Sequence, residues 1–462
     1  MDDKMQNVET HGESISGWGE LWRKEDWWAV WIGLGIVIIA ASFFLNDATI
    51  KPIAIKPAKW DTFATLIIHF KDQFHWYLFQ FLMWGILFTV SAKILGYRTR
   101  EFLPAFIFVY VISMLIFVLG SWSQAHRYNL EPPLLALVIG LLISNFARLP
   151  KWMDSGFRVE YYIKIGIVLL GATLPFTLIL WAGPIAILQA SIVSVLTFIV
   201  IYFIGVHMGV DRRLCACLGA GGAICGVSGA IAMAGAVRAT KEQISIAITL
   251  VIIWAMIMIF FLPFASRALE LHAGIAGAWI GTSEFADAAG LAAAQVYGLM
   301  AEASDTIPGT EDQALSAFTL IKVIGRDIWI GVWAFIFALI ATLRWEVKES
   351  RPKPSTMEIW WRFPKFVFGF LLASLLVTAL SSDYGYEEFK KIVEPNLVGP
   401  LKDLRTWTFI FCFLSIGLTT RFREFVHVGV KPIYSFSIGV LVNVIIGFVL
   451  SVFLFARHWT DI

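Results

Sequence analysis

Long apolar runs separated by short polar connections fill this 462-residue chain. A membrane helix needs about 20 apolar residues, so hydropathy is averaged over a sliding window of about 19 residues. With it, about thirteen runs can be counted, and the pattern predicts an all-α polytopic membrane protein with about 13 transmembrane helices. The runs are residues 27–45, 76–95, 102–122, 132–147, 158–181, 183–207, 213–238, 242–265, 274–298, 314–343, 361–381, 404–420 and 430–456.

One apolar run is built almost wholly of small residues, from Gly219 to Gly235. Each glycine weakens a helix by about 1 kcal/mol relative to alanine, so this run predicts an interrupted helix centred on Ile224–Ser228. Non-helical backbone inside a bilayer is tolerated only where protein or a water-filled cavity satisfies it, and transporters bind substrates at such breaks. The alternative is that the glycines serve only close helix packing.

The ten runs from residue 132 onward divide into two groups of five, residues 132–270 and 271–462. Five is an odd number, so a second copy would enter the membrane with opposite topology, which predicts an inverted repeat with two crossing broken helices. The fourth run of the second group, 404–420, is the expected partner of the glycine-rich run. Residues 27–131 are expected to form a lipid-facing or dimer-forming appendage of three helices, preceded by a cytoplasmic segment, 1–26.

Only 15% of the residues are charged, well below the roughly 25% of soluble domains, and the net charge is +2. A net charge this close to zero does not indicate the basic surface with which proteins bind nucleic acid. Lys and Arg gather in connections on the side of the N-terminus, with Arg267 and the linker Arg344–Arg362 counted there. The positive-inside rule then places the N-terminus in the cytoplasm, the C-terminus outside, and the protein in a bacterial inner membrane.

Enzyme and metal signatures are missing from the sequence. Cys215 and Cys217 form a C-x-C pair, but no second Cys/His pair stands at zinc-site spacing, and Cys225 and Cys412 lie in apolar runs. No nucleophile elbow, P-loop or His-Glu-x-x-His motif occurs. The sequence therefore predicts neither catalytic residues, nor a metal site, nor a cofactor.

Cys225, Gly226 and Ser228 surround the expected break. If a helix restarts near Ser228, its free N–H groups and positive dipole end can hold an oxyanion, with the hydroxyl as a further donor. Lys322 and Arg326 stand i, i+4 inside an apolar run, where a cation is costly unless paired or hydrated, and they are candidates for anion binding. The alternatives are a structural pairing with Asp327 or Glu284, or side chains that extend to the membrane interface.

Glu284 and Asp287 stand i, i+3 among small residues. Two close carboxylates suit a proton carrier, so they are the candidates for proton or sodium coupling. If a helix instead begins near Ser283, they are acids of its first turn.

Several motifs occur in an order that resembles the YeiH-like family, whose members carry the name of sulfate exporters. The motifs are Leu134–Asn145, Ile165–Ala172, Gly219–Ser228, Ser283–Gly290, Lys322–Arg326 and Ile416–Thr420. The resemblance implies a fold similar to that of bile-acid sodium symporters and cation/proton antiporters, in which a core bundle lies beside a panel bundle. It also implies a small anionic substrate and adds Thr419 to the substrate-binding candidates. The chain has Ser283-Glu284 where family members tend to have His-Glu, and three additional N-terminal helices.

These features together favour a secondary transporter, expected to export a small anion such as sulfate or an organosulfur anion by alternating access. A cation/proton antiporter using Glu284 and Asp287 is the alternative, although fixed positive charge at Lys322 and Arg326 repels a cation. A membrane-embedded enzyme or a channel is less compatible with the motifs. Membrane lipid is the expected environment, and a homodimer is one of the arrangements that the sequence leaves open.

Overall fold

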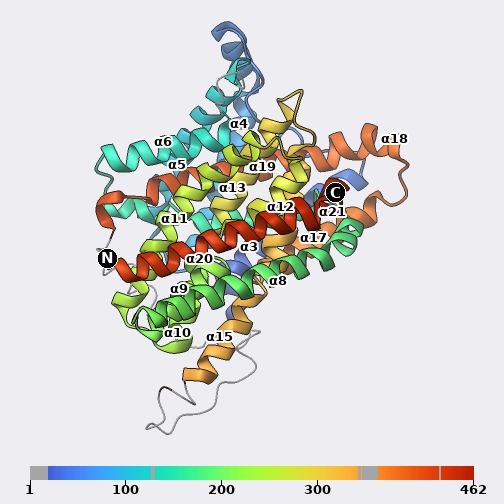
Figure 1. Cartoon of the computed structure of the whole chain (residues 1–462). Coiled ribbons are helices and arrows are strands. Elements are labelled where there is room, and N and C mark those ends of the chain that lie inside the picture. The colour runs from blue at the N-terminus through green and yellow to red at the C-terminus, as the bar shows by residue number, and fades with distance from the viewer. Residues whose placement is uncertain (1–18, 126–130, 342–344, 346–362, 426–427) are drawn as a thin grey trace.

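The computed structural model describes residues 19–125, 131–341, 345, 363–425 and 428–462 (Figure 1). Within these ranges the elements are helices, joined by turns and one isolated bridge between Trp60 and Trp122. In this described part of the chain, seven helical segments are long and apolar enough to cross a membrane, and Pro132–Phe146 and Phe366–Ser381 are shorter apolar helices. The predicted class, an all-α polytopic membrane protein, is confirmed. The linker Arg344–Arg362 and most of segment 1–26 lie outside the described residues.

A first group of helices, called the panel bundle, packs around α7 and α19. Glycines allow its closest approaches: a Cβ on Gly140 of α6 would lie 2.6 Å from the Leu414 carbonyl oxygen of α19, and a Cβ on Gly171 would lie 2.2 Å from the Phe370 oxygen. The bundle comprises α3 (Glu25–Leu45), α4 (Phe63–Ile94), α5 (Thr99–Gly120), α6 (Pro132–Phe146), α7 (Val159–Gly171), α17 (Phe366–Ser381) and α19 (Gly399–Thr419). Short helices α2 (Glu20–Arg23), η2 (Lys151–Ser155), α18 (Tyr386–Glu388), η5 (Phe389–Val398) and η6 (Phe422–Glu424) connect its members.

A second group, called the core bundle, lies beside the first and contacts it mainly through one helix, α13. Its members are α8 (Phe176–His207), α9 (Arg212–Ala223), α10 (Val227–Val237), α11 (Lys241–Ala268), α12 (Ala273–Ser283), α13 (Asp287–Glu302), α14 (Glu311–Thr319), the π-helix η3 (Leu320–Arg326), α15 (Trp329–Ile340), α20 (Val430–Val449), η7 (Leu450–Leu454) and α21 (Ala456–Thr460). This division into two bundles is the one that the family resemblance implies.

The glycine-rich run folds as a helical hairpin, here called hairpin 1. Asp211 caps α9 by accepting from the Arg213 and Leu214 amides, and the helix ends at Ala223, where the break begins. The chain then turns back: Arg213 Nη1 donates to the Arg238 carbonyl at 3.0 Å, and a Cβ on Gly229 would lie 2.9 Å from the Ala220 oxygen. A straight helix would separate Arg213 and Arg238 by roughly 37 Å. Hairpin 1 therefore enters and leaves at the same face.

Residues 273–302 form a second hairpin, hairpin 2, from α12 and α13. The Tyr297 hydroxyl of α13 donates to the Leu271 carbonyl just before α12, and the Ala273 amide donates to Pro308 O at 2.9 Å. Between the hairpins, α11 runs 28 residues, about 42 Å, which is enough to cross a bilayer. The two hairpins thus enter from opposite faces.

The position of the second interruption differs from the expectation. Run 404–420 belongs to the continuous helix α19, and its Gly417 serves close packing, since a Cβ there would lie 2.7 Å from the Gly140 Cα. The second break instead falls at Glu284–Ala286, inside the run expected as one helix, 274–298. Each interrupted element is moreover an antiparallel pair and does not continue across the membrane.

Two further expectations are wrong. Arg267 ends α11 at the face opposite to Arg213, because hairpin 1 returns to its face of entry before α11 crosses. Helix α3 is no peripheral appendage: Ala29 and Val37 are fully buried, Glu25 pairs with Arg158 at 3.0 Å, and Asp26 pairs with Lys164 at 2.8 Å.

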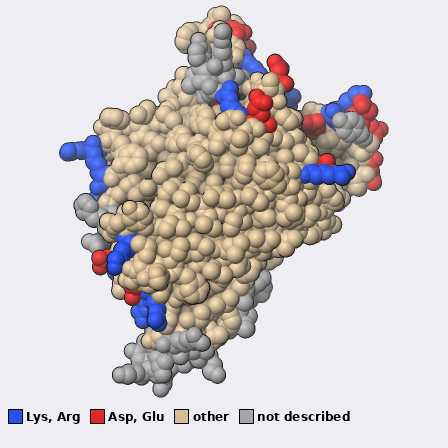
Figure 2. All heavy atoms as spheres, viewed as in Figure 1, with Lys and Arg blue, Asp and Glu red and all other residues tan. Residues whose placement is uncertain are grey.

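On the side of the molecule seen in Figure 2, charged side chains gather toward the two ends of the helices and leave a broad belt without them. The face at which α3 and hairpin 1 begin, with Arg213, Arg421 and Arg423, is called the basic face. The opposite face carries the base of hairpin 2 and the chain end, where Gln313 donates to Ile462 O at 2.7 Å, and is called the C-terminal face. The uncharged belt between the faces fits the hydrocarbon region of a bilayer.

Candidate substrate site at the hairpin tips

The tips of the two hairpins touch. Gly226 in tip 1 (Ile224–Gly226) has φ 68° and ψ −121°, a conformation that side chains other than glycine rarely adopt. A Cβ at this position would lie 3.3 Å from both the Ala286 Cα and the Phe285 carbonyl oxygen of tip 2 (Glu284–Ala286). Glycine is required here both for the turn and for the contact between the tips.

A helical span of 30 residues, Glu311–Ile340, passes beside both tips. Its central part is the π-helix Leu320–Arg326, a distortion that occurs frequently at functional sites. Lys322 and Arg326 project from this π-helix, and both side chains are fully buried. The span therefore places two cations near mid-membrane depth, where the tips meet.

The Arg326 guanidinium caps the ends of the first arms of both hairpins. Nε and Nη2 donate to the carbonyls of Ala223 and Gly222 at the end of α9, at 3.1 and 3.0 Å. Nη1 donates to the Thr282 carbonyl of α12 at 2.6 Å, with Gly281 O at 3.4 Å and Glu284 O at 3.3 Å. Helix C-termini carry orphan carbonyls and a partial negative charge, so one planar cation satisfies both ends.

Lys322 makes the corresponding contacts with the tip loops. Its ammonium group donates to Ile224 O of tip 1 and to Phe285 O of tip 2, the latter at 2.7 Å. Asp287 Oδ1 lies 3.3 Å away and forms the ion pair. The alternative of a structural pairing thus fits in part, but the partners are these backbone carbonyls and Asp287, where the alternative named Asp327 or Glu284.

The two candidate coupling carboxylates lie in or beside tip 2, and not on one face of a continuous helix. Glu284 is fully buried; its Oε1 accepts from the Ala286 amide at 3.0 Å, and its Oε2 has no hydrogen-bond partner among the described residues. Asp287 is the first residue of α13, where a negative charge favours the helix N-terminus. The alternative of a first-turn acid thus fits Asp287.

Ser228 and Cys225 lie on either side of Gly226. Cys225 is buried and belongs to the tip, whereas Ser228 is half-buried and is the second residue of α10. The first turn of α10 therefore offers its N–H groups and the Ser228 hydroxyl next to the tips. Cys225 is buried in the tip and is therefore a weaker candidate than Ser228 for contact with an anionic substrate.

Thr419 lies apart from these groups in the chain and in its contacts. It is the last residue of α19, and its hydroxyl donates to Ser415 O at 2.8 Å and Ile416 O at 3.2 Å. The adjacent Thr420 carbonyl accepts from Ser144 and Asn145 of α6 near the basic face. The other candidates gather at the tips, and the contacts of Thr419 belong to the panel bundle.

Asp327 is a buried carboxylate to which the sequence assigned only a pairing role. It follows Arg326 directly, is 2% exposed, and its Oδ1 has no hydrogen-bond partner among the described residues. Its position in an apolar run, beside Lys322 and Arg326 in the sequence, could have identified it as a candidate site residue. Three buried carboxylates, those of Glu284, Asp287 and Asp327, therefore lie in or near the tips together with the cations of Lys322 and Arg326.

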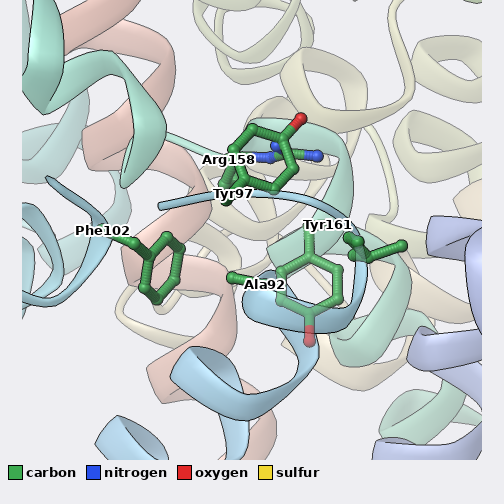
Figure 3. A pocket seen from close by; sticks show the side chains of 6 residues that line it. Ala92, Tyr97, Phe102, Arg158 and Tyr161 are labelled. Atoms are coloured by element: carbon green, nitrogen blue, oxygen red, sulfur yellow. The ribbon is translucent and has the colours of Figure 1, made fainter. Parts of the chain in front are cut away.

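Outside the tips, a small hollow opens between α4, α5 and α7 (Figure 3). Arg158 stacks over Tyr97 there, 4.0 Å from the ring centroid, and also pairs with Glu25. This hollow lies in the panel bundle and contains none of the candidate residues. No cluster of three His, Cys, Asp or Glu side chains that could hold a metal ion occurs in the described part of the chain.

Comparisons with known proteins agree with the resemblance. The family described as Conserved hypothetical protein 698 matches residues 104–435. A UPF0324 membrane protein of Rhodopirellula baltica is 32% identical over 417 residues, which cover 89% of this chain and 73% of that protein. A UPF0324 membrane protein of Nitrosomonas europaea is 31% identical over 448 residues, with 88% and 90% covered. One from Nitratidesulfovibrio vulgaris is 32% identical over 376 residues, and there the chain spans 62% of the relative's length. No solved structure matches the chain.

Proposed function

Because this chain belongs to the family described as Conserved hypothetical protein 698, whose relatives are named membrane proteins, we propose that it is a secondary transporter. The proposed cargo is a small anion such as sulfate or an organosulfur anion, exported by alternating access. The observation that supports this most is the meeting of two oppositely inserted hairpins around Lys322 and Arg326. Interrupted helices that meet near mid-depth form the substrate sites of many transporter folds.

The anion is proposed to bind at the first turn of α10. Helix N-termini attract anions, and the Ser228 hydroxyl, half-buried at that turn, is a further donor. Lys322, which already contacts both tips, adds positive charge nearby. In this arrangement Arg326 holds the hairpin ends in place, since its donors are used by backbone carbonyls, and it acts on the anion through its charge and through the geometry of the tips.

Coupling to protons or sodium is proposed to use Glu284 and Asp287. Both lie at tip 2, and Glu284 Oε2 is buried with no partner among the described residues. These carboxylates, with Asp327, also favour the second candidate, a cation/proton antiporter. The two candidates differ in the sign of the cargo, which a flux measurement separates.

The N-terminus is proposed to be cytoplasmic and the membrane to be a bacterial inner membrane. Lys and Arg are concentrated at the basic face, which carries the start of α3. A homodimer in the bilayer stays a proposal.

Reconstituted protein in lipid vesicles provides the test. Uptake of radiolabelled sulfate and of an organosulfur anion is measured with and without pH and sodium gradients, beside rubidium and sodium fluxes. Anion flux that depends on Ser228 supports the proposal. Flux of cations alone favours the antiporter, and no flux of either kind with folded protein contradicts transport.

A further inference from the structure

Polar contacts between the two bundles are distributed unevenly over the two faces. At the C-terminal face, Arg405 and Lys402 of α19 meet Glu311 and Asp312, the first residues of α14; these four are called the gate cluster. Arg405 lies 3.7 Å from Asp312 Oδ1 and 3.9 Å from Glu311 Oε1, and Lys402 pairs with Asp312 Oδ2. The cluster therefore joins the panel bundle to the core bundle by charge.

The basic face has no comparable link among the described residues. The polar contact across the bundles there is Thr420 Oγ1 to Met256 Sδ at 3.9 Å, and sulfur is a weak acceptor. Arg421 pairs with Asp154 of η2, which belongs to the same panel bundle. Among the described residues, the ion pairs that join the two bundles therefore lie at the C-terminal face.

Arg405 is held in place by both bundles. Its side chain is 2% exposed, and Nη1 also donates at 3.0 Å to the hydroxyl of Thr173, which follows α7 of the panel bundle. On the core side, Glu311 accepts from Gln295 of α13 at 2.6 Å. Since α13 is the arm of hairpin 2 that faces the panel, the cluster fixes hairpin 2 against α19.

From these contacts we infer that Arg405 is the gate residue of the transport cycle: its ion pairs with Glu311 and Asp312 close the C-terminal face, and separating them lets hairpin 2 move away from α19. The inference rests on the proposed function, because a gate has meaning only in alternating access. It adds that the present arrangement is closed toward the C-terminal face. A buried cation that loses its partners is costly, so an open arrangement must give Arg405 other polar partners.

Cys225 in tip 1 supplies the reporter. After Cys215, Cys217 and Cys412 have been replaced by alanine, a membrane-impermeant maleimide is applied to either face of oriented vesicles, and labelling of Cys225 is measured. Arg405→Gln and Asp312→Asn are each expected to raise labelling from the C-terminal face about tenfold, because each removes one side of the ion pairs that join the two bundles. The Asp312 side chain is 46% exposed, so Asp312→Asn is expected to fold even if the change at the buried Arg405 prevents folding. Arg405→Lys is expected to restore part of the closure.

The matched control is Asp403→Asn, which breaks the 2.6 Å pair between Lys56 and Asp403 at the same face but within the panel bundle. Unchanged labelling from the C-terminal face in both gate variants overturns the inference. Equal increases from both faces, or an increase in Asp403→Asn, also overturn it, because they indicate general loosening. Labelling needs no cargo, so a failed gate is distinguishable from a failed transport proposal, which the flux of the parent protein reports.

Discussion

Lys322 Nζ and Asp287 Oδ1 lie 3.3 Å apart, although one residue projects from the π-helix η3 and the other begins the second arm of hairpin 2. The same ammonium group bonds the carbonyls of both tips. The pair therefore joins three elements close to the point where the cargo is proposed to bind. Any movement of hairpin 2 relative to the span Glu311–Ile340 must stretch or break it.

The first prediction is a stability cycle on this pair. Removing one partner of a buried ion pair typically costs about 3–5 kcal/mol, because the other charge stays uncompensated. Lys322→Met is therefore expected to lower thermal stability strongly, and Lys322→Met with Asp287→Leu to recover much of the loss. Thermal unfolding in detergent provides the measurement. If the double variant is as unstable as both single effects added together, the two residues do not act as a pair.

The second prediction concerns coupling. Glu284→Gln and Asp287→Asn keep the shape of each side chain and remove its ability to carry a proton. Each is expected to flatten the pH dependence of flux more than it weakens cargo binding, because the carboxylates are proposed to carry protons and not to contact the anion. Flux in vesicles across a series of pH values, beside calorimetric binding, separates the two effects. Unchanged pH profiles in both variants would leave the carboxylates with a structural role.

The third prediction uses the glycine of tip 1. Gly226→Leu requires a side chain at φ 68° and a Cβ at 3.3 Å from the backbone of tip 2, so it is expected to abolish flux. Gly183→Ala is the matched control: it lies in α8 with no atom within 4 Å of its added Cβ, and alanine there is expected to stabilise the helix by up to ~1 kcal/mol. Normal flux in Gly226→Leu would show that the tips need not touch.

The contrast between the two breaks shows what the sequence determines. Break one was predictable because its cause is local: glycines at Gly221, Gly222 and Gly226 weaken any helix that includes them. Break two has no such density of glycine, and it is stabilised by Arg326 and Lys322, which come from a distant element. A local pattern cannot reveal a carbonyl that is satisfied by a remote side chain.

The hairpin turns were hidden for a related reason. Hydropathy shows that a segment is apolar, but it does not show whether the segment crosses the membrane or returns to the same face. In hairpin 1 the return is seen only in the structure, where Arg213 contacts Arg238. The error with Arg267 follows directly, because a miscounted crossing inverts the next connection. Gly417 led to the opposite error: it was interpreted as part of a broken helix, but it serves close packing in a continuous one. Glycine occurs in both situations, so the residue type alone does not separate them.

The fourth prediction separates two roles for Arg326. Its guanidinium donates to carbonyls of both hairpins, and hydrogen bonds of charged groups contribute about 1.5–3 kcal/mol each, so Arg326→Ala is expected to lower stability and flux together. Arg326→Lys is expected to recover only part, because a point charge cannot span both helix ends. Thermal unfolding and anion binding are measured on the same samples. A lysine variant with parental stability but tenfold weaker binding would instead make Arg326 a direct ligand.

The last prediction tests the anion site itself. Ser228 is half-buried at the first turn of α10 and is not among the side chains that hold the tips together. Ser228→Ala removes one donor to a charged cargo, which corresponds to about 1.5–3 kcal/mol or roughly ten- to hundredfold weaker binding. Stability is expected to stay unchanged, because no tip contact is lost, and Ser228→Thr, which keeps the hydroxyl, is the control. Calorimetry with sulfate and an organosulfur anion gives the binding constants, and Ser228→Ala protein that binds both as well as the parent would remove the α10 N-terminus as the binding site.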